Sequence, residues 1–199
     1  MATDPSQFHL LNVADTCSIW NVLSSVRLYA AAREAKCSFC CTEFVIYECL
    51  YKYRSNDVPE ERELIERLRR ETDQKRIVAY SLDIADLQAV EVLENRRRLS
   101  KGELSSIAFA QKTGQAFLTD DQKARKLAET VLPKRMTQTT THLFGWLIFT
   151  TRLSDSDKGD VIDEHERLRR PLRRYLEEIY LEALRCRLLA SNASQNDLN

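Results

Sequence analysis

Short apolar segments alternate along this chain with segments in which apolar residues recur every three or four positions. The short segments predict strands at residues 8–14, 38–42, 76–82 and 115–119. The segments between and after them predict helices at residues 19–32, 43–53, 58–73, 83–95, 99–113 and 122–130. Strands that alternate with helices form a parallel sheet with helices on both faces. The pattern therefore predicts an α/β fold.

The last third of the chain predicts further helices. Residues 141–150 are almost all apolar and suit either a strand or a buried helix, of which we favour the helix. Residues 160–190 combine charged and leucine-type side chains at helical spacing, which predicts one long helix with a kink at Pro171. We therefore divide the chain into a domain at 8–152, a helical extension at 153–190 and a flexible tail at 191–199. The extension packs on the domain, pairs with another chain or touches nucleic acid, and its interspersed glutamates favour packing.

Composition excludes some classes of protein. The 199 residues include 30 basic and 30 acidic side chains, and a net charge of zero gives no general indication of nucleic-acid binding. No apolar run approaches the roughly 20 residues that span a bilayer, and the first ten residues lack the pattern of a secretory signal. We therefore expect a cytoplasmic protein without a membrane partner.

Three of the six cysteines lie close together in the sequence. Cys37 and Cys40 have the spacing of half a zinc site, but no second cysteine or histidine pair completes it. Because a reducing compartment discourages disulfides, we interpret Cys37, Cys40 and Cys41 as small apolar residues of a strand.

Four acidic residues stand where a strand leads into a helix or near the start of a helix. They are Asp15, Glu48, Glu103 and Asp121. In open α/β sheets ligands bind beyond the carboxyl ends of the strands, so these side chains are expected to converge. Carboxylates so placed repel one another unless a divalent cation lies between them. The pattern predicts a magnesium or manganese site.

Each of these acids also has a purely structural interpretation. Asp15 can cap the helix that follows it. Ser100 and Glu103 have the spacing of a capping box. One of the adjacent residues Asp120 and Asp121 can cap the next helix, which leaves the other for a different role. Glu48, on a helix beside aromatic residues, can simply be half-solvated.

The same segments carry a resemblance to a known family. They are residues 14–18, 45–50, 102–110 and 118–128. The last two are the most specific: a glycine and an acid before an alanine-rich helix, and a threonine-x-aspartate sequence before a basic helix. Across about residues 8–150 the chain resembles the PIN-domain family of metal-dependent ribonucleases. The resemblance implies a three-layer α/β/α domain with a central, mostly parallel sheet.

The resemblance also implies roles for individual residues. The catalytic, metal-binding acids would be Asp15, Glu48, Glu103 and Asp121, with Asp120 as a spare ligand. Glu103 stands where many relatives have aspartate. Thr16 and Thr119 are the hydroxyls expected to orient the carboxylates. The residues expected to bind RNA phosphates are Lys101, Lys123, Arg125, Lys126 and the run 96–98, for which a solvated helix end is the alternative.

The implied activity is that of a Mg²⁺- or Mn²⁺-dependent endoribonuclease. Such cations lower the pKa of a water molecule and neutralise charge on the leaving oxygen of the phosphodiester. Many PIN-domain proteins are toxins held by an antitoxin, so a toxin-like role, an antitoxin or other protein partner, and a homodimer are left open. The alternative is a catalytically silent PIN-like module that binds RNA or protein.

Other α/β enzymes fit less well. A dehalogenase-type phosphotransferase needs Asp-x-Asp after its first strand, where this chain has Asp15, Thr16 and Cys17. A receiver domain needs paired acids near the first strand, and here the pair comes late. The chain has four glycines and no glycine-rich loop, which disfavours a nucleotide-binding enzyme.

Overall fold

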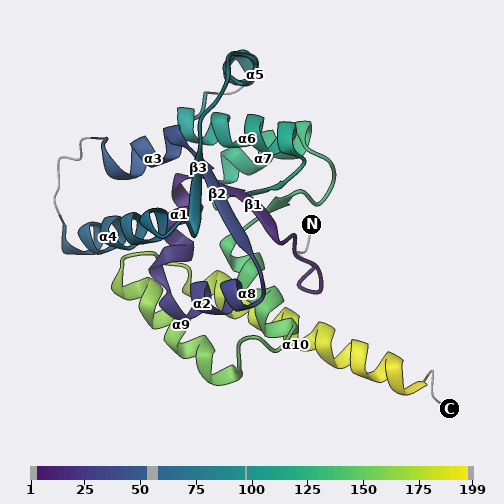
Figure 1. Cartoon of the computed structure of the whole chain (residues 1–199). Coiled ribbons are helices and arrows are strands. Elements are labelled where there is room, and N and C mark those ends of the chain that lie inside the picture. Colours follow the sequence, from purple (N-terminus) through teal and green to yellow (C-terminus); the bar gives the residue numbers. More distant parts are fainter. Residues whose placement is uncertain (1–3, 53–57, 97, 197–199) are drawn as a thin grey trace.

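The centre of the molecule is a parallel five-stranded sheet. The structure, a computed structural model, describes residues 4–52, 58–96 and 98–196 (Figure 1). The strands are β1 Leu11–Ala14, β2 Ser38–Thr42, β3 Ile77–Tyr80, β4 Ala116–Leu118 and β5 Thr137–Gln138. Their order in the sheet is β3-β2-β1-β4-β5, and every neighbouring pair is parallel. The predicted parallel sheet is confirmed.

Helices cover both faces of the sheet, which gives the expected three layers (Figure 1). The described residues form α1 Thr16–Ser24, α2 Val26–Glu34, α3 Glu43–Leu50, α4 Pro59–Asp73, α5 Ile84–Arg96, α6 Lys101–Thr113, α7 Gln122–Val131, α8 Thr140–Phe149, α9 Asp155–Arg167 and α10 Arg173–Asn196. One hydrophobic core joins α5, α6 and α7 to one face of the sheet. A larger core joins the other helices to the opposite face.

Local sequence signals explain most of these boundaries. Pro59 opens α4, where its missing N–H costs nothing. Gly114 ends α6 in the left-handed conformation, at φ 65°, which glycine adopts without strain. Residues 141–150 are helical, as favoured, and belong to α8. The strand β5 was not predicted, because a strand of two residues carries no alternating pattern.

The predicted helix at residues 19–32 is wrong, because two helices occupy this stretch. Ser25 separates them in an extended conformation, with φ −109° and ψ 115°. Its Oγ accepts a hydrogen bond from the Leu28 backbone N–H at 3.0 Å and donates one to Glu164 Oε2, in α9, at 2.6 Å. Ser25 is thus the N-cap of α2 and also ties α2 to α9. The apolar spacing runs through the break because both helices pack into the same core.

We expect Ser25→Ala to lower the free energy of unfolding by about 1–2 kcal/mol, the usual cost of losing a serine N-cap. Urea denaturation would measure it. The matched control is Ser81→Ala, because Ser81 is exposed in the loop after β3, and its effect should stay within about 0.5 kcal/mol. Equal effects of the two substitutions would show that the Ser25 side chain does not hold α2 against α9.

The single long helix predicted at residues 160–190 is also wrong. The chain turns at residues 168–172, between α9 and α10, where Arg169 has a φ of 55° and Pro171 prevents continuation of the helix. The helix α10 packs along α8 and places Leu176 and Ile179 in the larger core. Of the three alternatives for the extension, the structure therefore shows packing on the domain. The predicted tail differs, because α10 continues to Asn196, and residues 197–199 lie outside the described part.

Two further expectations can be compared with the structure. Cys37, Cys40 and Cys41 are buried, which confirms their interpretation as small apolar residues, but Cys37 precedes β2 and is not part of the strand. Among the described residues, every helix is too short or too polar to cross a bilayer.

Candidate carboxylate site

The strand order places a switch point between β1 and β4. From β1 the chain adds β2 and β3 on one side, and it then adds β4 and β5 on the other side. Ligands of open α/β sheets bind at this position, beyond the carboxyl ends of the strands. Asp15 directly follows β1, and residues 119–121 directly follow β4. The Asp15 backbone N–H donates to the Leu118 carbonyl at 3.2 Å, so the two strand ends lie side by side.

Asp15 is completely buried, with 0% of its surface exposed. Its Oδ1 accepts hydrogen bonds from the backbone N–H and the Oγ of Ser18, at 2.8 and 2.7 Å. Its Oδ2 accepts one from Thr119 Oγ1 at 2.5 Å. Burial raises the pKa of Asp15 to about 7 against the lowering effect of these hydrogen bonds. A nearby cation would favour the charged form of this carboxylate.

Glu48 reaches from α3 to the beginning of α6. Its Oε1 accepts from the Gly102 backbone N–H at 3.0 Å, and its Oε2 accepts from Thr16 Oγ1 at 2.7 Å. A Cβ atom on residue 102 would lie 2.5 Å from Glu48 Oε2. Gly102 therefore lets the carboxylate approach the α6 N-terminus, where free N–H groups and the helix dipole stabilise negative charge. This contact explains why the residue before Glu103 is a glycine.

Glu103 and Asp121 both cap helices, as their structural interpretations predicted. Glu103 Oε2 accepts from the Ser100 backbone N–H at 2.8 Å, and Ser100 Oγ accepts from the Glu103 backbone N–H at 3.2 Å. Asp121 Oδ1 accepts from the backbone N–H groups of Lys123 and Ala124, at 2.7 and 2.8 Å. In the described part of the chain, no hydrogen bond or ion pair is made to Glu103 Oε1 or Asp121 Oδ2. Each cap thus leaves one carboxylate oxygen available.

The predicted acids act on one another electrostatically. Burial raises the pKa of Glu103, and the charges of Asp121 and Glu48 raise it further. Thr119 links Asp15 to this group, because its Oγ1 donates to Asp15 and accepts from the Asp121 backbone N–H at 3.1 Å. Within the described residues, neither lysine nor arginine is among the main influences on the pKa of Asp15 or Glu103. Glu103 is therefore under the influence of Asp121 and Glu48, and Asp15 is joined to Asp121 through Thr119.

Asp120 has a different environment from Asp121. Its Oδ1 accepts from the Thr140 backbone N–H at 2.9 Å. Its Oδ2 accepts from Thr140 Oγ1 at 2.5 Å and from Asn21 Nδ2 at 2.8 Å. These bonds hold the start of α8 and the middle of α1 against the end of β4. Of the two adjacent aspartates, Asp120 has the evident structural role.

The oxygens of these acids suit a hard cation, although they do not enclose a metal position on all sides. Among the residues that the structure describes, no group of three or more histidine, cysteine, aspartate or glutamate side chains is arranged to hold a metal ion. Mg²⁺ usually keeps several waters and takes only one or two protein carboxylates, so it needs no closed cage. Carboxylate oxygens suit Mg²⁺ and Mn²⁺. The available oxygens of Glu103 and Asp121, with Asp15 and Glu48 nearby, fit this mode of binding.

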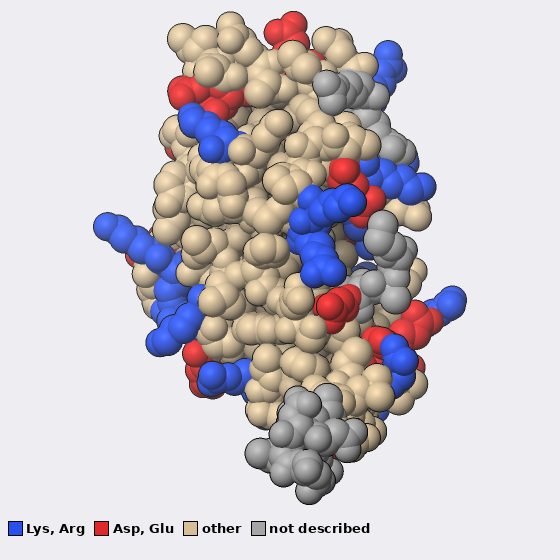
Figure 2. Space-filling view, turned by 90° about the vertical axis from the view of Figure 1, so that its right-hand side faces the viewer, with Lys and Arg blue, Asp and Glu red and all other residues tan. Residues whose placement is uncertain are grey.

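Apart from the run 96–98, the basic residues predicted to bind RNA lie on α6, with Glu103, or on α7, next to Asp121. Lys101 forms an ion pair with Glu94 at 2.5 Å. On α7, Lys123 and Lys126 are exposed and Arg125 is half-buried. In the run 96–98, Arg97 and the side chain of Arg96 lie outside the described residues. Figure 2 shows one face of the molecule, on which the visible basic side chains are scattered over a largely uncharged surface.

A pocket beside Glu48 was not predicted from the sequence. Its volume is about 600 Å³, and it is lined by Glu43, Phe44, Tyr47, Glu48, Lys52, Ser100 and Lys101. The aromatic residues Phe44 and Tyr47, close to Glu48 in the sequence, indicate one wall of this pocket. The other wall comes from the start of α6, some 50 residues later, and could not be predicted.

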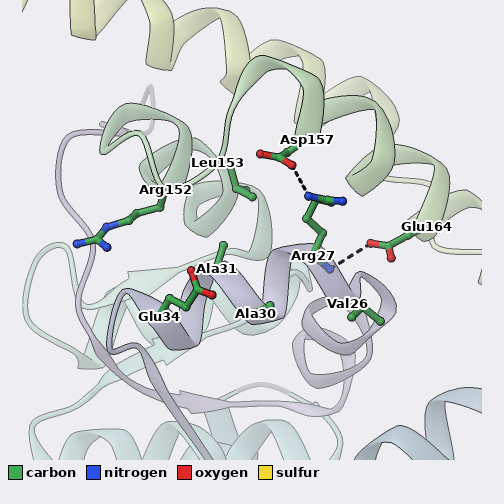
Figure 3. A pocket seen from close by; sticks show the side chains of 9 residues that line it. All are labelled: Val26, Arg27, Ala30, Ala31, Glu34, Arg152, Leu153, Asp157 and Glu164. Atoms are coloured by element: carbon green, nitrogen blue, oxygen red, sulfur yellow. Dashed lines mark hydrogen bonds and ion pairs between the residues drawn. The ribbon is translucent and has the colours of Figure 1, made fainter.

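A second pocket, of about 320 Å³, lies between α2 and the segment that leads into α9 (Figure 3). Arg27 Nη1 donates to Asp157 Oδ1 at 2.6 Å, and the Arg27 backbone N–H donates to Glu164 at 3.3 Å. Arg152 points away from these residues in Figure 3. The charged groups of Arg27, Asp157 and Glu164 thus serve the packing of α2 on α9.

The fold and the carboxylates together define an α/β protein with an acidic site at its topological switch point. Compared with models of known protein families and with curated proteins, the chain has no match.

The raised pKa of Asp15 predicts a pH dependence of stability. Its value of about 7 in the folded protein exceeds the ordinary 3.8, so the folded state holds the proton more tightly than the unfolded state. Below about pH 4 Asp15 is protonated in both states and its titration has no effect on stability. From there to about pH 7 it ionises only in the unfolded state, so the free energy of unfolding falls as the pH rises. In chelator, we expect the stability of Asp15→Asn relative to the wild type to rise by a margin of up to a few kcal/mol, roughly, over this range.

Urea denaturation at a series of pH values would measure this difference. Saturating Mn²⁺ should stabilise the wild type more than Asp15→Asn and reduce the margin. A margin that stays constant from pH 4 to pH 7 would contradict the assignment of a proton-holding Asp15.

Proposed function

We propose that this chain is a PIN-like endoribonuclease that hydrolyses RNA phosphodiester bonds with Mg²⁺ or Mn²⁺. The observation that carries the proposal is the available pair of oxygens on Glu103 and Asp121, beside Glu48 and the buried Asp15, at the switch point of the sheet. The resemblance of the same segments to the PIN-domain family supports it.

In this proposal the four acids hold the cation and two threonines position them. Thr119 fixes Asp15 through Oδ2, and Thr16 fixes Glu48 through Oε2. When bound, the cation would lower the pKa of a water molecule and neutralise charge on the leaving oxygen. Glu48 is held at the α6 N-terminus through Gly102. We leave Asp120 out of the ligand set because its hydrogen bonds hold α1 and α8 together and because Asp121, not Asp120, matches the threonine-x-aspartate sequence.

A cysteine nucleophile is a poor alternative. Cys17 is the cysteine nearest in sequence to Asp15, but burial and the charges of Asp15 and Asp120 raise the pKa of its thiol to about 12. The thiol therefore stays protonated at neutral pH, and the thiolate is the reactive form. Hydrolysis by a water molecule at the carboxylates fits the region better.

A silent PIN-like module that binds RNA or protein is the second candidate. One observation favours it: Asp15, Glu103 and Asp121 each cap a helix, and capping alone accounts for an acid at each position. In this case the protein would bind a partner without cleaving RNA.

Incubation with end-labelled structured and single-stranded RNAs would distinguish the two candidates. The proposed nuclease cuts in Mn²⁺ or Mg²⁺ and stops in chelator. RNA that is bound but remains intact in both metals would favour the silent module and contradict the proposal.

A further inference from the structure

The pocket beside Glu48 lies between α3 and the start of α6. Phe44 and Tyr47 come from α3, Lys52 follows that helix, and Ser100 and Lys101 open α6. Glu48 belongs both to this pocket and to the acidic site. A molecule in the pocket is therefore next to the proposed site of hydrolysis.

Tyrosines are exposed on this side of α3. Tyr47 is 57% exposed, and Tyr51, four residues later at the end of the helix, is 68% exposed. Residues four apart lie on the same side of a helix. Val45 and Cys49 anchor α3 in the core with its other side, so packing does not require tyrosines here. A tyrosine ring that faces solvent offers a flat surface for stacking and a hydroxyl for hydrogen bonds.

The charges around the pocket favour a neutral, flat group inside it. Glu43 and Glu48 line the wall and would repel a phosphate placed against them. Lys52 and Lys101 are exposed and suit a phosphate at the edge. The surface ion pair of Lys101 with Glu94 contributes little to stability, so the lysine can exchange partners.

We propose that this pocket holds one unpaired nucleobase of the RNA, stacked on Tyr47, next to the phosphate that lies at the carboxylates. This inference rests on the proposed function and narrows its substrate to RNA with an unpaired base at the cleavage point. Bases are sequestered by stacking within a duplex, whereas single-stranded bases are free to stack on aromatic side chains.

Binding of a short end-labelled RNA, measured by fluorescence anisotropy in chelator, tests the pocket apart from catalysis. We expect Tyr47→Ala to weaken binding of the single strand by about 10-fold, and Tyr47→Phe to keep it, because stacking needs only the ring. Tyr175→Ala is the matched control, since Tyr175 is also 57% exposed but lies on α10. It should bind like the wild type, and the matching duplex should bind weakly to every variant.

An abasic scan of the same RNA makes the test specific to one base. For the wild type, one abasic position should weaken binding about as much as Tyr47→Ala does, and at that position the two changes should not add. Equal binding by wild type and Tyr47→Ala, with RNA still cut in Mn²⁺, would contradict the proposed base-binding pocket but not the proposed nuclease activity. If the losses of affinity from Tyr47→Ala and from an abasic position add at every position of the RNA, the proposed base-binding pocket would also be contradicted. A wild type that neither binds nor cuts RNA would overturn both.

Discussion

Replacement of Asp121 by asparagine is expected to lower metal-dependent RNA cleavage by about 100-fold or more. Loss of a residue that only orients a metal ligand already costs about 10- to 100-fold, and Asp121 is proposed as a ligand itself. Its Oδ1 caps α7 and its Oδ2 is available among the described residues. An asparagine keeps an acceptor oxygen for the cap but removes the negative charge. We therefore expect little change in stability, and cleavage of end-labelled RNA in Mn²⁺ would measure the loss.

The adjacent Asp120 provides the control. Asp120→Asn leaves one oxygen and one amide where two oxygens now accept from Thr140 and Asn21. We expect it to cost about 1–3 kcal/mol of stability, because a buried donor loses its acceptor, and to keep cleavage within a few-fold below the melting temperature. Equal losses of cleavage in the two variants, with folding intact, would contradict the assignment of Asp121 as the ligand.

Replacement of Gly102 by alanine is expected to lower cleavage by about 10- to 100-fold, the usual cost of disturbing the support of a ligand. The new Cβ would lie 2.5 Å from Glu48 Oε2 and 2.9 Å from Glu48 Cδ. The Glu48 carboxylate must therefore leave its position at the α6 N-terminus. Because this carboxylate ends a flexible side chain, and alanine is the better helix former, the free energy of unfolding should change by less than about 1 kcal/mol.

Gly159→Ala is the matched control, because nothing lies within 4 Å of a Cβ atom added to Gly159 in α9. It should leave cleavage unchanged and stabilise the protein by up to about 1 kcal/mol. Full cleavage by Gly102→Ala would show that the position of Glu48 beside α6 is not required.

Most of the fold was predictable because its segments are locally consistent. The strands and helices from 38 to 131 carry apolar spacing and end signals such as Pro59 and Gly114 that agree with the final structure. The break at Ser25 was missed because the apolar spacing continues through it, and because its serine cap is also held by a hydrogen bond to Glu164, which is 139 residues away in sequence. At Pro171 we predicted a kink, but the structure has a full break between α9 and α10, because a proline is compatible with either.

The site was predictable in its residue types but not in its arrangement. Acids after strands are visible in the sequence, whereas the choice between Asp120 and Asp121 depends on Thr140 and Asn21. The contact of Glu48 with Gly102 joins two residues that lie 54 positions apart in sequence, on different helices. Such contacts depend on tertiary packing, which local periodicity does not specify.

Calorimetric titration with Mn²⁺ tests the central claim most directly, because it measures the cation at the carboxylates without any RNA. We predict binding to the wild type that Mg²⁺ displaces, weakened by at least about 10-fold in Asp121→Asn and Glu103→Gln and retained in Asp120→Asn. Equal binding by all four proteins would place the cation elsewhere. The absence of binding to the wild type would contradict a metal site at these acids.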